Sequence, residues 1–159
     1  MVFSMTRIRR AMPADAAWIT ALWNALIRDT AMTFTSVEKT ETGIAALIST
    51  QPMLVLGTSG GFATYGAFRK GPGYRHTAEH TIILAPGAQR QGGGRALLGA
   101  LEEVARGDAI HVMVAGIAAK NEPARAFHAA CGYREVAYMP EVGQKFGEWQ
   151  DLVLMQKAL

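Results

Sequence analysis

Apolar residues recur along this chain with two spacings, and the wider spacing predicts helices. From Pro13 to Arg28 they return every three or four positions, which is typical of an amphipathic helix with one buried face. A second helix is predicted from Ser36 or Val37 to Thr50, because Pro52 follows it and prolines end helices. Between these two helices, the polar segment 29–35 is expected to be a loop that carries Met32 and Phe34.

The narrower spacing and short apolar runs predict strands, several of them in the second half of the chain. The expected strands are Thr6–Arg9, Met53–Gly57, Phe62–Arg69, Glu79–Leu84, Ile110–Ile117, Tyr133–Met139 and Trp149–Gln156. Ile110–Ile117 is apolar on both faces, which favours a central position in a sheet. The segment Val142–Gly147 is expected to be a loop between the last two strands.

Two further helices are predicted between these strands. One follows Gly94 and ends at Gly107, and the other begins after Asn121, a favourable N-cap residue, and ends at Gly132. Strands and helices alternate without an internal repeat or a linker. The pattern therefore predicts a single mixed α/β domain over residues 1–159, with residues 1–5 as a loose extension.

Composition removes several classes of protein. Half of the 159 residues are hydrophobic and 18% are charged, which excludes a disordered chain, while the apolar runs are too short for a membrane span. The basic residues are scattered and the net charge is +3, so we expect no nucleic-acid partner. The four histidines lie far apart, so no metal is expected, and the single cysteine, Cys131, fits a reducing cytoplasm.

The most informative stretch joins a predicted strand, a glycine-rich loop and a helix start. Gly92, Gly93 and Gly94 leave backbone N–H groups uncovered at the positive end of the helix dipole, which is a natural site for a phosphate or pyrophosphate. A nucleotide P-loop would need Lys and Ser or Thr after the last glycine, but Arg95 and Ala96 stand there. A dinucleotide fingerprint would need a third glycine where Leu97 stands.

The loop matches a third pattern instead. Gln89-Arg90-Gln91-Gly92-Gly93-Gly94 fits the motif Gln/Arg-x-x-Gly-x-Gly/Ala, and four further runs occur around it in a characteristic order. These runs are 74–80, 110–115, 121–133 and 142–151. Together they resemble the GNAT superfamily of acyl-CoA N-acyltransferases, in its phosphinothricin and methionine sulfoximine N-acetyltransferase branch. This branch usually has glycine at the position of Arg90 and an aliphatic residue at that of Gly93.

The resemblance implies a fold, a cofactor and an activity. The fold would be a central, mostly antiparallel, twisted sheet of about six to seven strands flanked by helices. The chain would use acetyl-CoA, without a metal, to acetylate the primary amine of a small amino acid or analogue by direct attack in a ternary complex. It would form a homodimer. An acetyltransferase of protein N-termini or polyamines, or a non-catalytic acyl-CoA-binding module, is the alternative.

The resemblance also assigns roles to individual residues. The cofactor would be bound by Ile82, Ile83, Leu84, Gln89, Arg90, Gln91, Gly92, Gly93, Gly94, Arg95 and Asn121. The acceptor would contact Arg69, Glu79, His80, Thr81 and Lys145, with Arg69 on its carboxylate and Lys145 in the pocket of its own or a neighbouring subunit. Independently of the resemblance, the apolar Phe34 in the polar loop either fills the core or lines the acceptor pocket. Asn121 is equally well explained as an N-cap, and Arg69 as a solvated residue at a strand end.

Two catalytic candidates follow from the same stretch and from the helix after Asn121. Glu79, on an otherwise apolar strand, would have a raised pKa and could act as the general base; the alternative is an ion pair with Arg69 or Arg75. His128 occupies the position where many relatives carry a tyrosine that protonates the thiolate, so it either donates a proton or packs in the core. Cys131 is expected to be structural.

Overall fold

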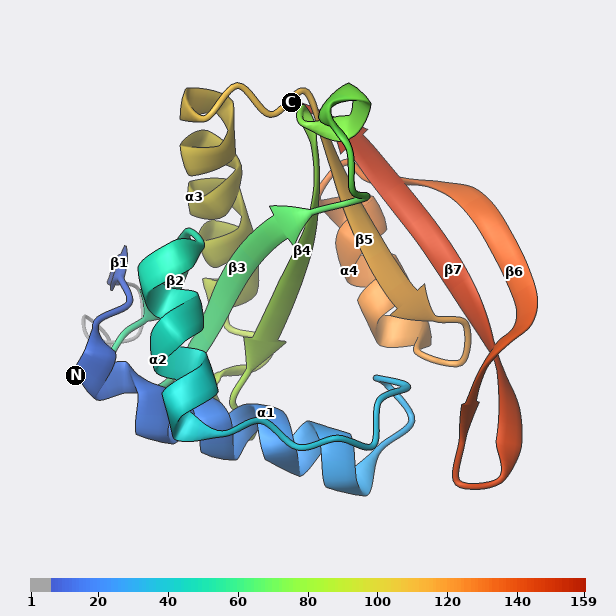
Figure 1. Ribbon diagram of the computed structural model, residues 1–159, viewed down its shortest axis with the longest axis horizontal. Coiled ribbons are helices and arrows are strands. Elements are labelled where there is room, and N and C mark those ends of the chain that lie inside the picture. Colours follow the sequence, from blue (N-terminus) through green and yellow to red (C-terminus); the bar gives the residue numbers. More distant parts are fainter. Residues whose placement is uncertain (1–6) are drawn as a thin grey trace.

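The computed structural model describes residues 7–159, so the extension expected at residues 1–5 lies outside the described part (Figure 1). The centre of the fold is a seven-stranded sheet with the strand order β1-β2-β3-β4-β5-β7-β6. The strands are β1 (Ile8–Arg10), β2 (Met53–Leu56), β3 (Gly61–Ala67), β4 (Thr77–Leu84), β5 (Val112–Ala118), β6 (Arg134–Lys145) and β7 (Glu148–Ala158). Only β4 and β5 pair in parallel. The predicted mixed α/β fold with a mostly antiparallel sheet is confirmed.

Helices cover both faces of the sheet. The four α-helices of residues 7–159 are α1 (Ala16–Asp29), α2 (Glu41–Thr50), α3 (Gly93–Gly107) and α4 (Glu122–Ala130). Apolar residues of α1 and α2 form one core with Val55, Phe62 and Ile83. Apolar residues of α3 and α4 form the other core with alternate residues of β2, β3, β5 and β7. Strand β2 is buried at every position because it lies between the two cores.

Strands β4 and β5 pair over only three residues. Their parallel register runs from Thr77 opposite Val112 to Glu79 opposite Val114 and stops there. Beyond this point β4 remains paired with β3, and β5 with β7, while the two strands diverge (Figure 1). The divergence opens the sheet on the C-terminal side of Glu79 and leaves two strand edges unpaired with each other.

Two predicted boundaries are wrong. The second helix begins at Glu41 rather than Ser36 or Val37, because Thr40 is its N-cap and accepts a hydrogen bond from the Gly43 N–H. The segment before it is extended and is held by Asn24 of α1. The Asn24 side chain accepts from the Lys39 N–H at 2.7 Å and donates to the Lys39 carbonyl at 2.9 Å.

The expected loop over Val142–Gly147 is largely strand. Strand β6 continues to Lys145, and β7 resumes at Glu148 after a turn of two residues. Phe146 and Gly147 have φ angles of 54° and 75°, the left-handed pair of a type I′ hairpin turn. Such turns are usually recognised by Asn-Gly, but here the first turn residue is Phe146. Because phenylalanine rarely adopts a positive φ, the sequence did not predict this turn.

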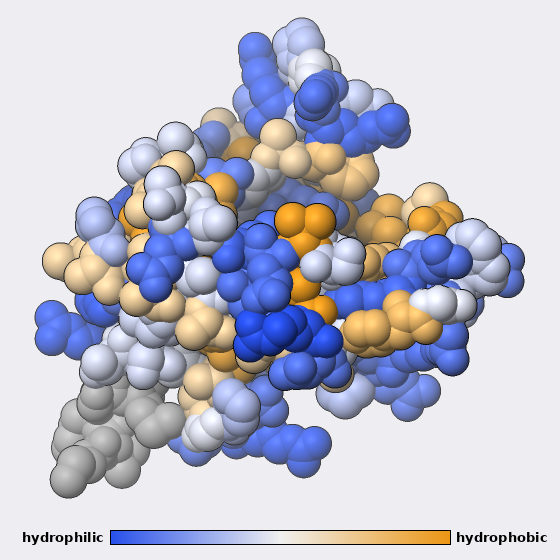
Figure 2. Space-filling model, turned by 60° about the horizontal axis from the view of Figure 1, so that its bottom comes forward, coloured by the Kyte–Doolittle hydropathy of each residue, from blue (hydrophilic) through white to orange (hydrophobic). Residues whose placement is uncertain are grey.

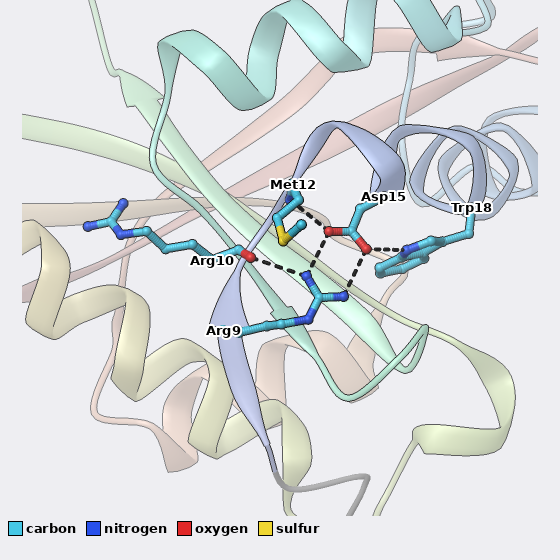
Figure 3. A network of polar contacts seen from close by, with 5 residues as sticks. All are labelled: Arg9, Arg10, Met12, Asp15 and Trp18. Atoms are coloured by element: carbon cyan, nitrogen blue, oxygen red, sulfur yellow. Dashed lines mark hydrogen bonds and ion pairs between the residues drawn. The ribbon is translucent and has the colours of Figure 1, made fainter.

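The start of α1 is fixed to β1 by a buried carboxylate (Figure 3). Asp15 accepts two hydrogen bonds from the Arg9 guanidinium, at 2.8 and 2.9 Å, and further bonds from Met12 N–H and Trp18 Nε1–H. The hydrogen bonds from Arg9, aided by those from Met12 and Trp18, lower the pKa of Asp15 to about 2 although burial opposes this shift. The network orients the helix that later contributes Trp23 and Leu26 to the candidate site.

Two further properties concern the described residues as a whole. Within residues 7–159, no helix combines the length and apolar character that crossing a membrane would require. In the same range, the histidine, cysteine and acidic side chains form no group of three that could hold a metal ion.

Candidate active site

A cavity of about 450 Å³ lies where β4 and β5 diverge. Its walls come from α1 and the segment after it, from both diverging strands and from α4. The lining residues are Trp23, Leu26, Met32, Thr33, Phe34, Glu79–Leu84, Gln89, Ala115–Ala118, Asn121, Ala124, His128 and Leu152. The cavity thus extends from the expected base to the expected cofactor loop, and its walls are mostly apolar.

Glu79 contributes the carboxylate of this cavity. It is the last β4 residue paired with β5, and a Cβ added at Gly116 would lie 3.3 Å from its Oε1 atom. Burial raises its pKa above the usual carboxyl value of 4.5. Among the described residues it forms no ion pair, so the alternative pairing with Arg69 or Arg75 is not made.

Two buried histidines meet in the wall on the opposite face of β4. His80 from β4 and His128 from α4 place their Nε2 atoms 2.9 Å apart, and their rings are stacked. Both side chains are buried, at 6% and 4% exposure. Burial lowers the pKa of His80 to about 3 and also lowers that of His128, so both imidazoles are neutral near pH 7.

The surroundings of the pair assign the proton positions. His128 Nδ1 lies 2.7 Å from the carbonyl oxygen of Ala124, which can only accept, so this nitrogen carries the proton. In a neutral ring His128 Nε2 is then an acceptor, and His80 Nε2 donates to it. His80 Nδ1 is left as an acceptor, and it is buried without a hydrogen-bond partner among the described residues.

A second polar layer lies behind the two rings. Tyr133 packs edge-on against both imidazoles and donates its hydroxyl proton to Glu102, which is also paired with Lys157 at 2.9 Å. Burial, followed by the bond to Glu102, raises the pKa of the Tyr133 hydroxyl. Lys157 also donates to the carbonyl of Cys131, which ends α4. Cys131 does not line the cavity.

The glycine loop leads from Gln89, which lines the cavity, to the start of α3, whereas the expected cofactor residues Arg90–Arg95 are not among the lining residues. Gly92 has a φ of 82° and nothing within 4 Å of an added Cβ, so it serves the left-handed turn before the helix. Gly93 and Gly94 have helical conformations but are packed closely, since added Cβ atoms would lie 2.6 Å from Leu56 and 2.9 Å from Leu84. The glycines therefore serve tight packing as well as an open helix start.

This helix start can bind an anion. The first bond of the helix is donated by Ala96 to the Gly92 carbonyl, so the N–H groups before it have no partner within α3. Arg90 and Arg95 are exposed beside them, and Gln91 donates to the Gly87 carbonyl. Arg90 has a left-handed φ of 60°. The positive dipole end, the free N–H groups and two guanidinium groups fit a pyrophosphate.

Between the two ends, the divergent strands provide backbone edges. Ile82, Ile83 and Leu84 line the cavity on the β4 side, where β4 has no β5 partner. Asn121 lines it from the start of α4 while its side chain accepts from the Ala124 N–H, so the N-cap role and a ligand contact are compatible. An extended ligand with amide groups fits such a slot.

Two of the expected acceptor residues lie outside the cavity. Arg69 follows β3, is exposed, and its guanidinium lies over the Tyr74 ring at 5.6 Å. Lys145 is buried, and its ammonium group donates to the carbonyls of Ile27 and Thr33. Among the described residues, no lysine or arginine lines the cavity. Phe34, Glu79, His80 and Thr81 do line it.

Most of the apolar wall residues could not be predicted to line a cavity. Trp23 and Leu26 lie on the periodic face of α1, where pocket-lining and core residues look the same, and Ala115–Ala118 lie in or next to the strand predicted at Ile110–Ile117. The pairing of His80 with His128 was also missed, since the two residues are 48 positions apart. The one sequence feature that the two histidines share is that each occupies a position whose side chain is predicted to face inward.

Comparison with known proteins identifies similar chains. The sequence model described as the acetyltransferase (GNAT) family matches residues 13–133. L-amino acid N-acyltransferase MnaT of Escherichia coli is 38% identical over 96% of this chain and 93% of the relative. An L-methionine sulfoximine/L-methionine sulfone acetyltransferase of Salmonella typhimurium is 38% identical over 96% and 94%. The structure of yncA from Salmonella typhimurium with its cofactor acetyl-CoA has a TM-score of 0.92 and 37% identity, covering 96% of this chain and 93% of that one.

Proposed function

The chain belongs to the GNAT acetyltransferase family, and from this premise we propose that it acetylates the primary amine of a small amino acid or analogue with acetyl-CoA. Methionine sulfoximine, methionine sulfone and phosphinothricin are the acceptors we propose to test first. One observation carries the proposal: the unpaired Glu79 carboxylate lines the same cavity as Gln89, the first residue of the loop that leads into the anion-binding start of α3.

Different parts of the protein would bind different parts of acetyl-CoA. The α3 start, Arg90 and Arg95 would hold the pyrophosphate, and the β4 edge at Ile82–Leu84 together with Asn121 would align the pantetheine arm. Acetyl-CoA supplies an activated thioester when bound. The apolar walls exclude water and strengthen the electrostatic contacts inside the cavity.

Glu79 would supply the general base. An amino acid arrives as an ammonium ion, and the unpaired carboxylate of Glu79 would attract it and accept a proton, directly or through one water. The freed amine lone pair can then attack the acetyl carbonyl. A raised pKa suits this task, because a base with a pKa closer to neutral holds the abstracted proton better.

The resting state of His128 favours a structural role over proton donation. Its Nδ1 proton is held by the Ala124 carbonyl, and its Nε2 atom accepts from His80. Neither nitrogen therefore offers a proton to a leaving thiolate. Protonation of the thiolate would instead come from the proton held at Glu79 or from water.

A thiol-release assay tests the proposal. Purified protein with acetyl-CoA should release CoA when methionine sulfoximine, methionine sulfone or phosphinothricin is added, and mass spectrometry should find one acetyl group on the acceptor amine. Turnover should require the free amine, so the N-methylated and N-acetylated analogues are the matched controls. No acetylated product across a broad panel of amines would refute the proposal.

The position of Arg69 favours a second candidate, an acetyltransferase of protein N-termini or polyamines. A free amino acid has a carboxylate that needs a cationic partner, but Arg69 lies over Tyr74, outside the cavity, and no described lysine or arginine lines the cavity. Comparing methionine with methionine amide and a methionyl peptide separates the candidates. Preference for the free acid, lost in Arg69→Met, supports amino-acid acceptors; preference for the amide or peptide supports the second candidate.

We also propose a homodimer in a cytoplasmic setting. Strand β6 ends the sheet, and exposed apolar side chains gather on it and on the adjoining hairpin (Figure 2). These are Val136, Tyr138, Met139, Val142, Phe146 and Trp149. An unpaired edge with such side chains is suited to pairing with a second copy. Light scattering should give twice the chain mass, and Val136→Glu with Val142→Glu should give the monomer; a wild-type monomer would refute the dimer.

A further inference from the structure

The β6–β7 hairpin holds a buried ammonium group against the wall of the cavity. Lys145 is 4% exposed, and its Nζ donates to the Ile27 carbonyl at 2.6 Å and the Thr33 carbonyl at 2.9 Å. Ile27 lies in the last turn of α1, where carbonyls lack helical partners and the dipole favours a cation. Lys145 therefore joins the end of α1 to the segment that follows it.

The same hairpin contacts Phe34 directly. A Cβ added at Gly143 would lie 2.3 Å from Phe34 Cδ2 and 2.7 Å from Cε2, so the ring packs closely against the bare backbone of Gly143. No larger residue fits there unless Phe34 moves. Since Phe34 lines the cavity, any movement of its ring changes the shape of the cavity.

The wall segment Met32–Phe34 has few other restraints. It contains no helix or strand, and Met32 is half exposed. Its internal bonds are made by Met32 and Val37 N–H groups to the nearby hydroxyls of Thr30 and Thr35. Over residues 7–159, the bond from Lys145 is the one hydrogen bond that reaches Met32–Ser36 from outside residues 30–37.

We propose that the β6–β7 hairpin determines acceptor selectivity, with Lys145 as a positioning residue for Met32–Phe34 and Gly143 as the residue that sets the depth of the pocket at Phe34. The cavity that results places Trp23, Leu26, Met32 and Phe34 on one side and the Glu79 carboxylate on another. It fits an acceptor with an apolar or thioether-like side chain and a cationic amine. This inference rests on the proposed function, because it names the acceptor class of the same site.

Lys145→Met is the first test, because methionine has a similar length but donates no hydrogen bond. We expect hydrogen exchange in residues 30–37 to become about tenfold faster, because the Thr33 carbonyl loses its only outside donor. The KM for the preferred acceptor should rise by about tenfold while kcat and the Kd of CoA change less than about threefold. Lys120→Met is the matched control, since Lys120 is an exposed surface residue paired with Glu148.

Gly143→Ala is the second test and does not depend on removing a buried charge. The added methyl must push Phe34 into the cavity, so preference should shift toward acceptors with shorter side chains. Adding Phe34→Leu should restore the original preference. The thermal midpoint and CoA affinity of each variant show whether it is folded.

The outcomes separate this inference from the proposed function. Unchanged exchange in residues 30–37 of Lys145→Met, or an unchanged acceptor preference in folded Gly143→Ala, would overturn the inference. A loss of CoA affinity equal to the loss of acceptor affinity would also overturn it. Faster hydrogen exchange confined to residues 30–37 supports the positioning role even if no acceptor is turned over. The absence of turnover would refute the proposed function but not the positioning role.

Discussion

His80 and His128 share one hydrogen bond between their Nε2 atoms, which lie 2.9 Å apart in the wall of the cavity. The Ala124 carbonyl fixes the proton of His128 on Nδ1, and this leaves His80 as the donor within the pair. The charged groups nearest to the rings, Glu102 on α3 and Lys157 on β7, are paired with each other. The pair is thus a neutral unit in which the Ala124 carbonyl determines the tautomer of His128, and His128 determines that of His80.

Nitrogen-15 NMR of histidine-labelled protein should detect this arrangement. We expect His128 in the Nδ1–H tautomer and His80 in the Nε2–H tautomer, assigned with His80→Gln and His128→Gln. Because burial lowers the pKa of both rings, both should be neutral at pH 7, and His80, with a pKa of about 3, should remain neutral down to pH 5. An imidazolium signal from either ring at pH 7 would contradict the assignment.

Glu79→Gln should lower kcat/KM by about 10²- to 10⁴-fold, because the amide keeps the shape but cannot accept a proton. CoA affinity should not change, since Glu79 is not part of the α3 start proposed to bind the pyrophosphate. The base works only when deprotonated, and burial raises its pKa, so activity should fall on acidification at a pH above the usual carboxyl value of 4.5. Initial rates between pH 4 and 9 measure this limb.

Two results would oppose a role for Glu79 as base. One is a Glu79→Gln variant that keeps at least a third of the wild-type rate. The other concerns the fall of the rate at acidic pH. If the pH of this fall follows the pKa of each acceptor amine and is the same in Glu79→Gln and the wild type, the free amine in solution is the reacting form and no protein base is needed.

Arg90 stands in a left-handed conformation, with a φ of 60°, which glycine adopts without strain. Such a conformation costs a non-glycine residue about 1–2 kcal/mol, and the greater flexibility of glycine in the unfolded chain returns part of this. Arg90→Gly should therefore raise the free energy of unfolding by up to about 1 kcal/mol, measured by urea denaturation. It should also weaken CoA binding, because one guanidinium beside the pyrophosphate site is lost.

Arg90→Ala is the matched control for this prediction. It removes the same charge and keeps the Cβ atom, so it should weaken CoA binding to a similar extent without a gain in stability. Equal stability of the two variants would show that the backbone at residue 90 is not strained. Equal CoA affinity of Arg90→Gly and the wild type would remove Arg90 from the binding site.

The parts of the fold that depend on local chemistry could be predicted from the sequence. The strand at Glu79–Leu84, the left-handed turn at Gly92 and the α3 start follow from short-range rules of periodicity and glycine conformation. Position-specific contacts over long separations could not be predicted. The resemblance to the family predicted that Lys145 binds substrate, whereas its hydrogen-bond acceptors are carbonyls 118 and 112 residues earlier in the chain. The hairpin turn could not be predicted at Phe146, because its positive φ depends on the pairing of β6 with β7 on either side of the turn.

Asp15→Asn should destabilise the protein in a pH-dependent manner. The bonds from Arg9 keep the folded pKa near 2, against 3.8 for an ordinary aspartate, so ionised Asp15 contributes about 2 kcal/mol of stability. A folded pKa below the unfolded one gives stability that is complete above about pH 4 and is lost as the pH falls toward 2. Urea denaturation should therefore show a difference of about 2 kcal/mol between variant and wild type at pH 7, which narrows below pH 4.

Glu38→Gln provides the comparison for Asp15→Asn. It removes an exposed ion pair with Arg28 near the other end of α1, and such pairs contribute about 0–1 kcal/mol. Its effect should be small and should disappear in high salt, whereas the buried Asp15 network is screened far less. A difference for Asp15→Asn that persists unchanged at pH 2, or that disappears in salt as the Glu38→Gln difference does, would mean that Asp15 does not anchor α1 through its charge.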